Sequence, residues 1–559
     1  MFEKLARKLG LETNPAIFFI SAGLTVLFVV CAIAFTDTVD LVFGATSDWI
    51  LSQMGWLYIL GVTSFLIFLI WIAFSRFGHI RLGPPDSTPD YTNLTWFCML
   101  FAAGIGSILM FWGVAEPISH FAEPPQGNAQ PGSVEAAEQA MGFTLYHFGL
   151  HTWTIFCLPA LAFAYFVYRK GLPFRVSSIF YPFLGERVHG PIGRTIDIFA
   201  VLGTLFGVAV TIGLGTMQIN SGLNTLFGLE ESRLTQIILI SVITLIAVIS
   251  VMTGLDVGIK WLSSINIVMA VGLLLFVFFA GSTLFLAKGI IETTGVYLEW
   301  LVPLSFWNDT FGNTGWQGSW TVFYWAWTIT WSPFVGIFIA RISKGRTIRE
   351  FVLGVLGLPT AFSIVWFSVF GLSSFDIEMN QGGGLVEEVV EQEDIPGALF
   401  SFLTHYPLAT LLSMVAIVIV VIFFTTSSDS ASLVVDMLCS GTADSPTRQR
   451  VFWGITEGVV AATVLTASGV GGLDALQQTI IVFGLPFFVI GFFMMAALVK
   501  ALRAETAEGS GAQRERTAPL AVRSRRIRRQ NRRADGGAPG GAGGEGAANG
   551  KRGNGTPEP

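Results

Sequence analysis

The chain has 559 residues, of which 52% are hydrophobic and only 13% charged, with a net charge of −6 and a mean hydropathy of +0.64. A soluble domain carries about 25% charged residues, so this composition excludes a water-soluble globular protein. Apolar runs recur that are long enough to cross the roughly 30 Å hydrocarbon layer as helices. We therefore predict an all-α polytopic membrane protein. The alternating ten-residue patterns of a β-barrel are absent from the sequence.

In chain order, residues 1–14 are a basic N-terminus, and no A-x-A cleavage site follows that would make the first apolar run a signal peptide. Hydropathy and helix breakers predict twelve spans after it. They lie near 15–36, 55–76, 91–115, 138–168, 194–224, 234–254, 259–287, 317–341, 351–373, 397–425, 450–468 and 476–501. The segment 289–315 mixes Trp, Tyr and Pro with acids, which predicts a helix lying at the membrane interface.

The charged loops predict the orientation through the excess of basic residues on the cytoplasmic side. Basic residues precede the first span and follow even-numbered ones: Lys4, Arg7, Lys8, Arg76, Arg81, Arg169, Lys170, Arg175, Arg341, Lys344, Arg346 and Arg349. Acids gather on the other side: Glu116, Glu123, Glu135, Asp376, Glu378, Glu387, Glu388, Glu391, Glu393 and Asp394. Twelve spans with both termini in the cytoplasm satisfy this distribution, in a bacterial inner membrane. No nucleic-acid partner is expected.

The tail at 502–559 is first basic and then rich in Gly and Ala, and the last part cannot form a packed core. The arginines include Arg525, Arg526, Arg528 and Arg529. Each basic residue near an anionic leaflet contributes about 1 kcal/mol of attraction. The tail is thus either a topology anchor that contacts anionic headgroups or a regulatory sensor.

Two spans carry polar or small residues at membrane depth. In "FAAGIGSILMFWG" (101–113), Gly104, Gly106 and Ser107 either allow close helix packing or mark an unwound stretch of the kind that binds substrate and ions in transporters. In "FFTTSSDSAS" (423–432), hydroxyl oxygens offer ligands for a cation such as Na⁺, or cap the end of the helix. We place Asp429 at the cytoplasmic end, capping or paired with a loop arginine.

Aromatic residues crowd two further spans. "TVFYWAWTITWSPF" (321–334) has five rings before its proline, interrupted by Thr328. In "YHFGLHTWTIF" (146–156), the rings of Phe148, Trp153 and Phe156 fall on one broad helical face. His147 and His151 have the i, i+4 spacing of a metal pair, but no acidic third ligand accompanies them, so we expect packing or hydrogen bonding. The four cysteines show no C-x-x-C spacing, and neither a disulfide framework nor a cysteine metal site is expected.

Rings at this density suit one class of ligand. Ring faces attract a quaternary ammonium by about 0.5–2 kcal/mol each. Three or four rings would therefore hold a permanently charged solute without any fixed carboxylate. The sequence predicts a binding site for an onium compound within the membrane.

The stretch "SWTVFYWAW" (319–327) closely resembles the signature of the betaine–choline–carnitine transporters, and "WSPFVGIFIARISKGRTIREF", "FAAGIGSILMFWGVAEP", "GLGTMQIN" and "TTSSDSAS" agree with the same family. The resemblance extends to about residue 500. It implies a LeuT-like fold with two extra helices (15–76) and two inverted five-helix repeats (91–287 and 317–501). It also implies a homotrimer, no cofactor, and Na⁺ as the coupling ion.

The resemblance also assigns site residues. The substrate site it implies consists of Phe148, Trp153, Phe156, Phe323, Trp327, Thr328 and Trp331, together with Gly104, Ile105, Gly106, Ser107 and Ile108. The sodium site it implies consists of backbone oxygens of Ala102, Ile105 and Phe423 and the hydroxyls of Thr426 and Ser427. A second sodium site would use Thr204 beside the pathway residue Phe334, but Val208 stands where a second hydroxyl is needed.

Departures from the family pattern bear on the substrate. Thr328 stands where the signature has a second Trp, Phe148 where Trp is usual, and Phe156 where Tyr is usual. The cage is weaker by about 1–3 kcal/mol on the per-ring scale, so either affinity is lower or the ligand differs from trimethylglycine. Choline members resembling this region carry Asp at the position of Ile108. Because Ile108 stands there in place of Asp, a zwitterion such as glycine betaine, ectoine or dimethylsulfoniopropionate is favoured over choline.

The predicted function is Na⁺-coupled import of such a solute by alternating access. A Na⁺-independent exchanger of carnitine or betaine and a choline carrier are the alternatives. A channel would need a continuous polar pore, and an enzyme would need a nucleophile–base pair or a metal set. The sequence contains neither pattern.

Overall fold

The computed structural model describes residues 2–102, 106–253, 256–442, 446–467 and 472–517. Helices make up most of these ranges, and their one β interaction is an isolated bridge between Arg81 and Thr347. Residues up to Val499 form one compact unit, and Lys500 begins a second. The all-α fold class is confirmed.

Ten helical segments in the described ranges are long and apolar enough to cross a membrane. They lie in α2 (Pro15–Ala34), α3 (Thr36–Phe74), α6 (Val134–Phe148) with α7 (Leu150–Phe163) and η1 (Ala164–Arg169), α10 (Pro191–Phe227), α11 (Arg233–Thr253), α12 (Asp256–Ala280), η3 (Gly318–Val322) with α14 (Phe323–Ile342), α15 (Ile348–Asn380), α17 (Ala409–Ser440) and α19 (Gly472–Thr517). The remaining helices are α1 (Phe2–Leu9), α4 (Asn93–Ala102), α5 (Gly106–Ala122), α8 (Val176–Ile179), α9 (Tyr181–Leu184), η2 (Gly185–His189), α13 (Thr283–Ser305), η4 (Glu387–Glu391), α16 (Ala398–Thr404) and α18 (Thr447–Ala467). The predicted spans at 91–115 and 450–468, which correspond to α4–α5 and α18, are not among the ten.

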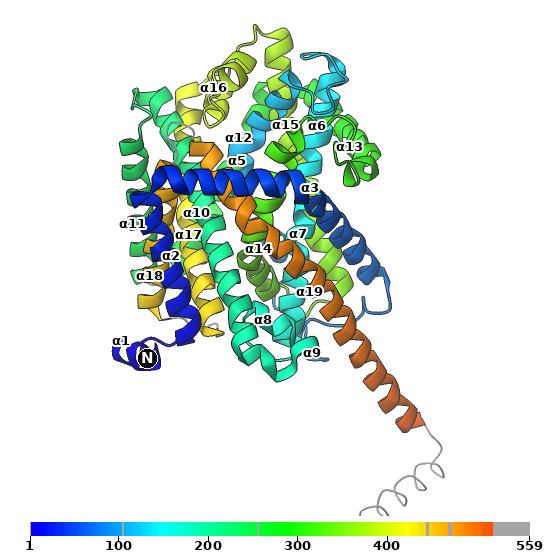
Figure 1. The fold of residues 1–559 in the computed structure, drawn as a ribbon. Coiled ribbons are helices and arrows are strands. Elements are labelled where there is room, and N and C mark those ends of the chain that lie inside the picture. Colours follow the sequence, from blue (N-terminus) through cyan, green and yellow to red (C-terminus); the bar gives the residue numbers. More distant parts are fainter. Residues whose placement is uncertain (1, 103–105, 254–255, 443–445, 468–471, 518–559) are drawn as a thin grey trace, which may run out of the picture. The chain divides into compact units, whose positions relative to one another are not determined.

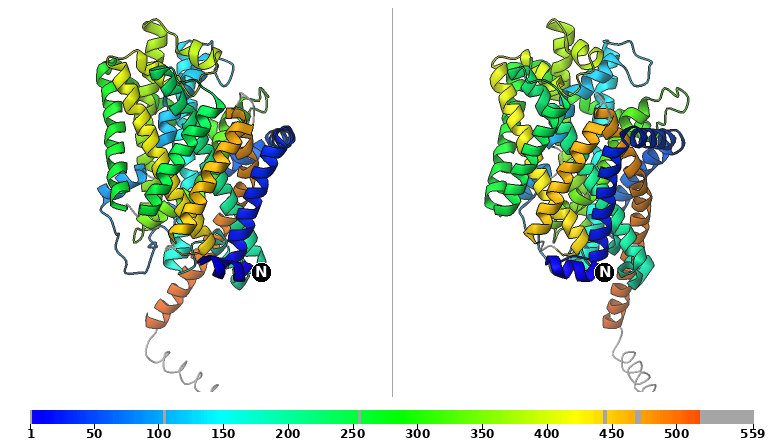
Figure 2. Two further views of the ribbon diagram at one scale, coloured as in Figure 1. Left: turned by 90° about the vertical axis from the view of Figure 1, so that its left-hand side faces the viewer. Right: turned by 60° about the vertical axis from the view of Figure 1, so that its left-hand side comes forward.

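The second predicted span, 55–76, starts too late. Helix α3 begins at Thr36, directly after Phe35, where the backbone (φ −134°, ψ 46°) breaks the path of α2. Its first half crosses the bundle at a large angle to α2, as two directions of view show (Figures 1 and 2). This half carries exposed Leu41, Val42 and Trp49. The sequence analysis missed it because polar residues interrupt its apolar run.

Two other predicted spans contain breaks. The 138–168 span is interrupted at Gly149, where an added Cβ would lie 2.5 Å from both the Leu145 carbonyl oxygen and the Tyr297 hydroxyl oxygen. Only glycine fits there, and the chain turns from α6 into α7. The 397–425 span was wrong in both bounds, because Leu408 adopts a left-handed conformation (φ 66°) between α16 and α17. The hydroxyl-rich stretch therefore lies inside α17 and does not end a helix.

The predicted interfacial segment and tail also have different bounds. In place of 289–315 the structure has α13, which ends at Ser305. Helix α19 continues to Thr517, past the predicted end at 501, because residues 501–517 are rich in Ala, Glu and Arg, which favour helix. Arg525, Arg526, Arg528 and Arg529 lie outside the described residues, and the division into two inverted repeats stays a prediction.

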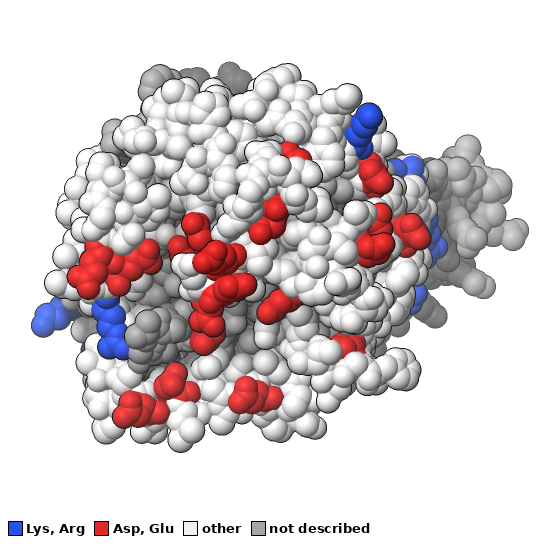
Figure 3. Space-filling view, turned by 90° about the horizontal axis from the view of Figure 1, so that it is seen from above, with Lys and Arg blue, Asp and Glu red and all other residues white. Residues whose placement is uncertain are grey.

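Charged residues separate as the loop pattern predicts. Seen from above, one end of the molecule carries a group of acidic side chains with few basic ones (Figure 3). The N-terminus lies at the opposite end (Figures 1 and 2). Among the basic loops, Leu82 N–H donates to the Arg346 carbonyl oxygen and Gly345 N–H donates to the Leu82 carbonyl oxygen, both at 2.8 Å. Ile348 N–H donates to Ile80.

Gly354 and Gly357 of α15 offer a matched pair for testing helix packing. A Cβ at Gly354 would lie 2.3 Å from the Trp96 ring, whereas a Cβ at Gly357 would meet nothing within 4 Å. We expect Gly354→Ala to lower the melting temperature of the detergent-solubilised protein, since overpacking costs about 1–3 kcal/mol. Gly357→Ala should leave it unchanged or raise it, because Ala favours helix by about 1 kcal/mol over Gly. Equal melting temperatures would contradict the Trp96 contact.

Candidate functional site

The aromatic stretch identified in the sequence forms η3 and α14 and is buried along its whole length. Helix α14 packs against α7 and α10. Its rings at Phe323, Trp327 and Trp331 are at most 3% exposed. Thr328 is also buried, and its hydroxyl donates to the Tyr324 carbonyl oxygen at 2.6 Å. The interruption of the ring series is thus a polar side chain satisfied within its own helix.

The predicted ring residues fall into two groups. In the first ring group, Phe148 stacks on Phe367 (4.5 Å between centroids) and meets Tyr324 edge-on (5.1 Å). Trp112 contacts Tyr324 and Phe323, and Phe323 stacks on Trp327 at 5.9 Å.

The second ring group lies around α7. Trp153 contacts Phe156 (5.7 Å), Phe156 contacts Trp331 (6.1 Å), and Trp331 contacts Phe334 (5.4 Å). Helix α14 joins the two groups, because Trp327, Thr328 and Trp331 lie within little more than one turn of it. The part of these residues in binding stays a prediction.

Both ring groups contain buried indole N–H donors without a partner, and in the first group Trp112 Nε1 has no acceptor among the described residues. Trp327 Nε1 donates to the Thr211 hydroxyl at 2.9 Å. Trp153 Nε1 and Trp331 Nε1 are buried and have no acceptor among the residues that the structure describes. A buried donor without a partner costs about 1–3 kcal/mol, so the second ring group has two N–H donors that a ligand oxygen or a water would stabilise.

The broken helix lies beside the hydroxyl-rich helix, as an ion site requires. A Cβ at Gly106 would lie 1.9 Å from the Phe423 ring, so α5 can start against α17 only with glycine there. One turn further along α17, the Thr426 hydroxyl donates to the carbonyl oxygens of Ile422 (2.8 Å) and Phe423 (3.1 Å). The lone pairs of its oxygen remain able to accept a cation. Ser427 is half-buried.

Other predicted members of these sites are described only in part. Gly104 and Ile105 lie outside the described residues, and for Ala102 and Ser107 the structure gives only the helical backbone. Ile108 is buried. At the predicted second sodium site, the Thr204 hydroxyl is buried without a partner in the described part of the chain, and the apolar Val208 is buried near it in α10.

Two intramembrane acids lie close to the hydroxyl-rich stretch. Asp429 is within α17, and its Oδ1 is 3.1 Å from Arg450 Nη2 at the start of α18. The predicted pairing with an arginine is confirmed, but Arg450 lies in α18 and not in a loop, and Asp429 does not end its helix. Glu457, which the sequence analysis missed, is fully buried and accepts a hydrogen bond from the Ser428 hydroxyl at 3.1 Å. A lone acid in the 450–468 span was the signal that could have revealed it.

Glu116 is not a loop residue, contrary to the charge-based prediction. It lies inside α5 and is 0% exposed, beside His120 and His147. The two histidines come from two helices, His120 from α5 itself and His147 from α6, and His120 is in reach because α5 continues to Ala122. His151 turns to another partner, with its Nε2 2.8 Å from the Ser305 hydroxyl. The two histidines His147 and His151 therefore make hydrogen bonds to different partners, which is the role predicted for them.

Two open cavities adjoin each other at the acidic end of the molecule. The first, about 690 Å³, lies between the loop at 122–131 and the segment 314–320, and Trp316 and Trp320 line it. The second, about 430 Å³, shares Ala122 and Glu123 with it and is also lined by Glu378 and Glu391. Trp320 contacts Trp112 at 5.8 Å, so rings connect the first cavity to the first ring group.

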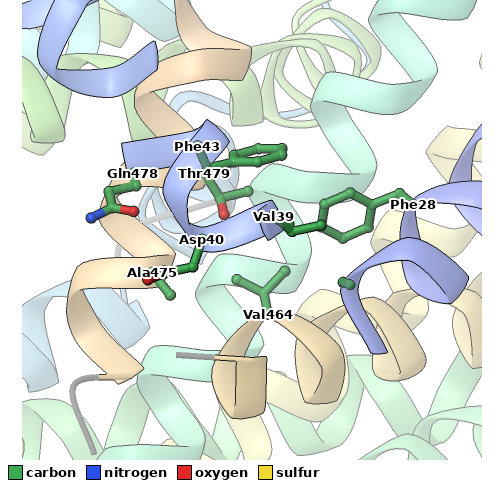
Figure 4. Close-up of a pocket in the computed structure, with 9 residues that line it drawn as sticks. Phe28, Val39, Asp40, Phe43, Val464, Ala475, Gln478 and Thr479 are labelled. Atoms are coloured by element: carbon green, nitrogen blue, oxygen red, sulfur yellow. The ribbon is translucent and has the colours of Figure 1, made fainter. Parts of the chain in front are cut away.

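A third cavity lies beneath the crossing half of α3, where Val39, Asp40 and Phe43 face Val464 of α18 and Thr479 of α19 (Figure 4). Its volume is about 20 Å³. A cavity of about 10–15 Å³ holds one water. This one has room for a water molecule and is too small for an organic solute.

Comparison with known proteins covers almost the whole chain. The model of the family described as BCCT, betaine/carnitine/choline family transporter, matches residues 16–507. The ectoine/glycine betaine/proline transporter EctP of Corynebacterium glutamicum is 48% identical over 502 residues, covering 89% of this chain and 82% of that protein. A glycine betaine transporter of Acinetobacter baylyi is 43% identical (92% and 77% covered), and the high-affinity choline transport protein of Escherichia coli K12 is 42% identical (91% and 75% covered).

Proposed function

This chain belongs to the betaine/carnitine/choline transporter family, and from that premise we propose that it imports a small zwitterionic onium solute together with Na⁺. It is a multi-pass membrane transporter and not an enzyme. Glycine betaine, ectoine and dimethylsulfoniopropionate are the type of solute proposed. The observation that carries the proposal is the second ring group, in which buried ring faces and unpartnered indole N–H donors occur together.

A zwitterion uses both properties of that group. Its cationic part interacts with the ring faces of Trp153, Phe156 and Trp331, and with that of Trp327, which lies about one turn from Trp331 on α14. Its carboxylate accepts hydrogen bonds from Trp153 Nε1 and Trp331 Nε1, which otherwise lack an acceptor in the described structure. Choline has no carboxylate, and the buried apolar Ile108 offers it no counter-charge. These contacts favour a zwitterion over choline.

The relatives support a broad substrate class. The names of three of them include glycine betaine, ectoine, proline or choline. Ectoine and proline do not carry a trimethylammonium head, and a site with Thr328 in place of a ring suits such compounds. We therefore propose that ectoine-like zwitterions bind about as well as glycine betaine.

Coupling to Na⁺ is supported by the contact between Gly106 and Phe423 and by the hydroxyls that follow it on α17. One cation crossing 100 mV contributes about 2.3 kcal/mol of driving force. Val208 offers no hydroxyl at the second site, so we propose that one Na⁺ is transported per cycle. An exchanger that needs no Na⁺ would have no use for Thr426 and Ser427.

We propose further that the acidic end faces outward, with both termini in the cytoplasm of a bacterial cell. Glu123, Glu378 and Glu391 line the outer cavities and would attract the cationic head of a solute. Assembly as a homotrimer and contact of the basic tail with anionic lipid are parts of the same proposal.

Uptake into proteoliposomes tests the whole proposal. Glycine betaine and ectoine should accumulate when a Na⁺ gradient is imposed, and choline should accumulate poorly. Accumulation of choline above both zwitterions would reject the substrate assignment. Solute counterflow at full rate without Na⁺ would instead identify an exchanger.

Substitutions at Trp327 and Thr211 distinguish the effect of the Trp327 ring face from the effect of the hydrogen bond that its Nε1 donates. We expect Trp327→Leu to raise the KM for glycine betaine about 2- to 30-fold, the equivalent of one cation–π contact of about 0.5–2 kcal/mol. Trp327→Phe keeps a ring and should have a smaller effect. Thr211→Val keeps the ring of Trp327 and removes the acceptor of its Nε1, together with a bond that the hydroxyl donates to the Gly207 carbonyl of its own helix at 2.9 Å. If Thr211→Val raised the KM as much as Trp327→Leu does, the orientation of the indole and not its ring face would determine binding.

Thr426→Ala tests the ion site. Loss of this hydroxyl should raise the Na⁺ concentration for half-maximal uptake about tenfold, the equivalent of about 1.4 kcal/mol. Thr463→Ala on α18 is the matched control, since its hydroxyl donates to the carbonyl four residues earlier at 2.7 Å, as Thr426 does at 2.8 Å. Unchanged Na⁺ dependence in Thr426→Ala, measured as uptake against Na⁺ concentration, would reject the assignment.

A further inference from the structure

Three buried side chains from two helices converge at one point outside the ring groups. His147 Nδ1 lies 2.6 Å from Glu116 Oε1, and His120 Nε2 lies 3.3 Å from the same oxygen. One ligand atom from each of the three residues lies within 4.8 Å of the others, and all three side chains are fully buried. Two imidazoles and a carboxylate are thus held together with no solvent around them.

The hydrogen bonds of this cluster are incomplete. Neither ring nitrogen of His120 makes a hydrogen bond to any described residue. The Glu116 carboxylate faces the Tyr324 hydroxyl as well as the two histidines. Buried polar atoms are nearly always paired in folded proteins. Both nitrogens of His120 are therefore available as ligand atoms.

Two histidines and one carboxylate form a common ligand set for zinc, with Zn–N distances of about 2.0–2.1 Å and Zn–O distances of about 2.0–2.2 Å. Ligand atoms around such an ion are about 3–3.5 Å apart, and the observed separations need only small side-chain shifts to reach this geometry. The second nitrogen of His147 lies 2.9 Å from the Thr321 hydroxyl. Such a bond to the other nitrogen fixes the ring of a metal-bound histidine.

The cluster adjoins the first of the two open cavities at the acidic end through two tryptophans. The His120 ring contacts Trp320 at 4.5 Å and Trp316 at 5.0 Å, and both tryptophans line that cavity. On its other side, the His147 ring is 4.9 Å from Tyr324, which belongs to the first ring group. The cluster therefore connects α5, α6 and η3 between the cavity and the predicted substrate site.

We propose that Glu116, His120 and His147 bind a transition-metal dication of the zinc type, and that the bound ion holds α5, α6 and η3 together and thereby inhibits transport. The ion enters when Trp316 and Trp320 separate. The inhibition rests on the proposed transport function, whereas binding of the ion does not, so the two are measured separately.

Binding is measured on the purified full-length protein with Zn²⁺ by calorimetry, and with Co²⁺ as a spectroscopic substitute. We expect one buried site per chain. His120→Gln should weaken it at least tenfold, since loss of groups that merely support a ligand already costs about 10–100-fold. His120→Cys, which supplies a thiolate ligand, should retain it. The control His189→Gln changes an exposed histidine 3.8 Å from Glu186 and should leave the site unchanged.

Transport is then measured as uptake with Zn²⁺ outside the vesicles. Wild-type protein and His189→Gln should be inhibited alike, and His120→Gln should need at least tenfold more Zn²⁺ while keeping its uptake without metal. Absence of a stoichiometric site in the wild-type protein would overturn the proposal whatever the variants do. Equal Zn²⁺ affinity of the wild type and His120→Gln would overturn it as well. Binding without inhibition would reject the gating part alone.

Discussion

Close contact between glycine backbones and large side chains is the constraint on which the arrangement of this bundle depends. In a membrane, helices associate through packing and not through loss of water from apolar surface, so small residues decide where they can meet. A Cβ at Gly215 or Gly222 of α10 would lie within 2.3 Å of the rings of Phe424 and Phe400. The contact of Gly106 with Phe423 follows the same pattern and brings the broken helix to the hydroxyl-rich one. Without that approach, the residues predicted to bind the ion would not lie close together.

Local signals in the sequence predicted a large part of this structure. Hydropathy located ten helices, and the charges of the loops located the acidic end. What could not be predicted depends on distant partners. Glu116 and His147 are 31 positions apart, and Ser428 and Glu457 are 29 apart. Neither spacing corresponds to one face of a helix. The continuation of α17 through its hydroxyls also escaped prediction, since it depends on each group finding an acceptor, as Thr426 does in its own helix.

The single aromatic box expected from the sequence divides into two ring groups in this structure. Phe148 turns to Tyr324 and Phe367, whereas Trp153 and Phe156 turn to Trp331. The spacing of residues along a helix shows how many rings share one face of that helix, but it does not show which rings contact each other. The distribution of unpartnered N–H donors adds information about the ligand, because ring faces select a cation and N–H groups select an anion on the same molecule.

The backbone bonds between the basic loops have a mechanical consequence. They join the chain just after α3 to the chain just before α15, and the Arg349 guanidinium adds a bond to the carbonyl of Ala73 at the end of α3. These bonds fix two segments that are far apart in sequence to each other. During any change of conformation the end of α3 and the start of α15 should therefore move together as one rigid body, and the hinge should lie elsewhere along the helices.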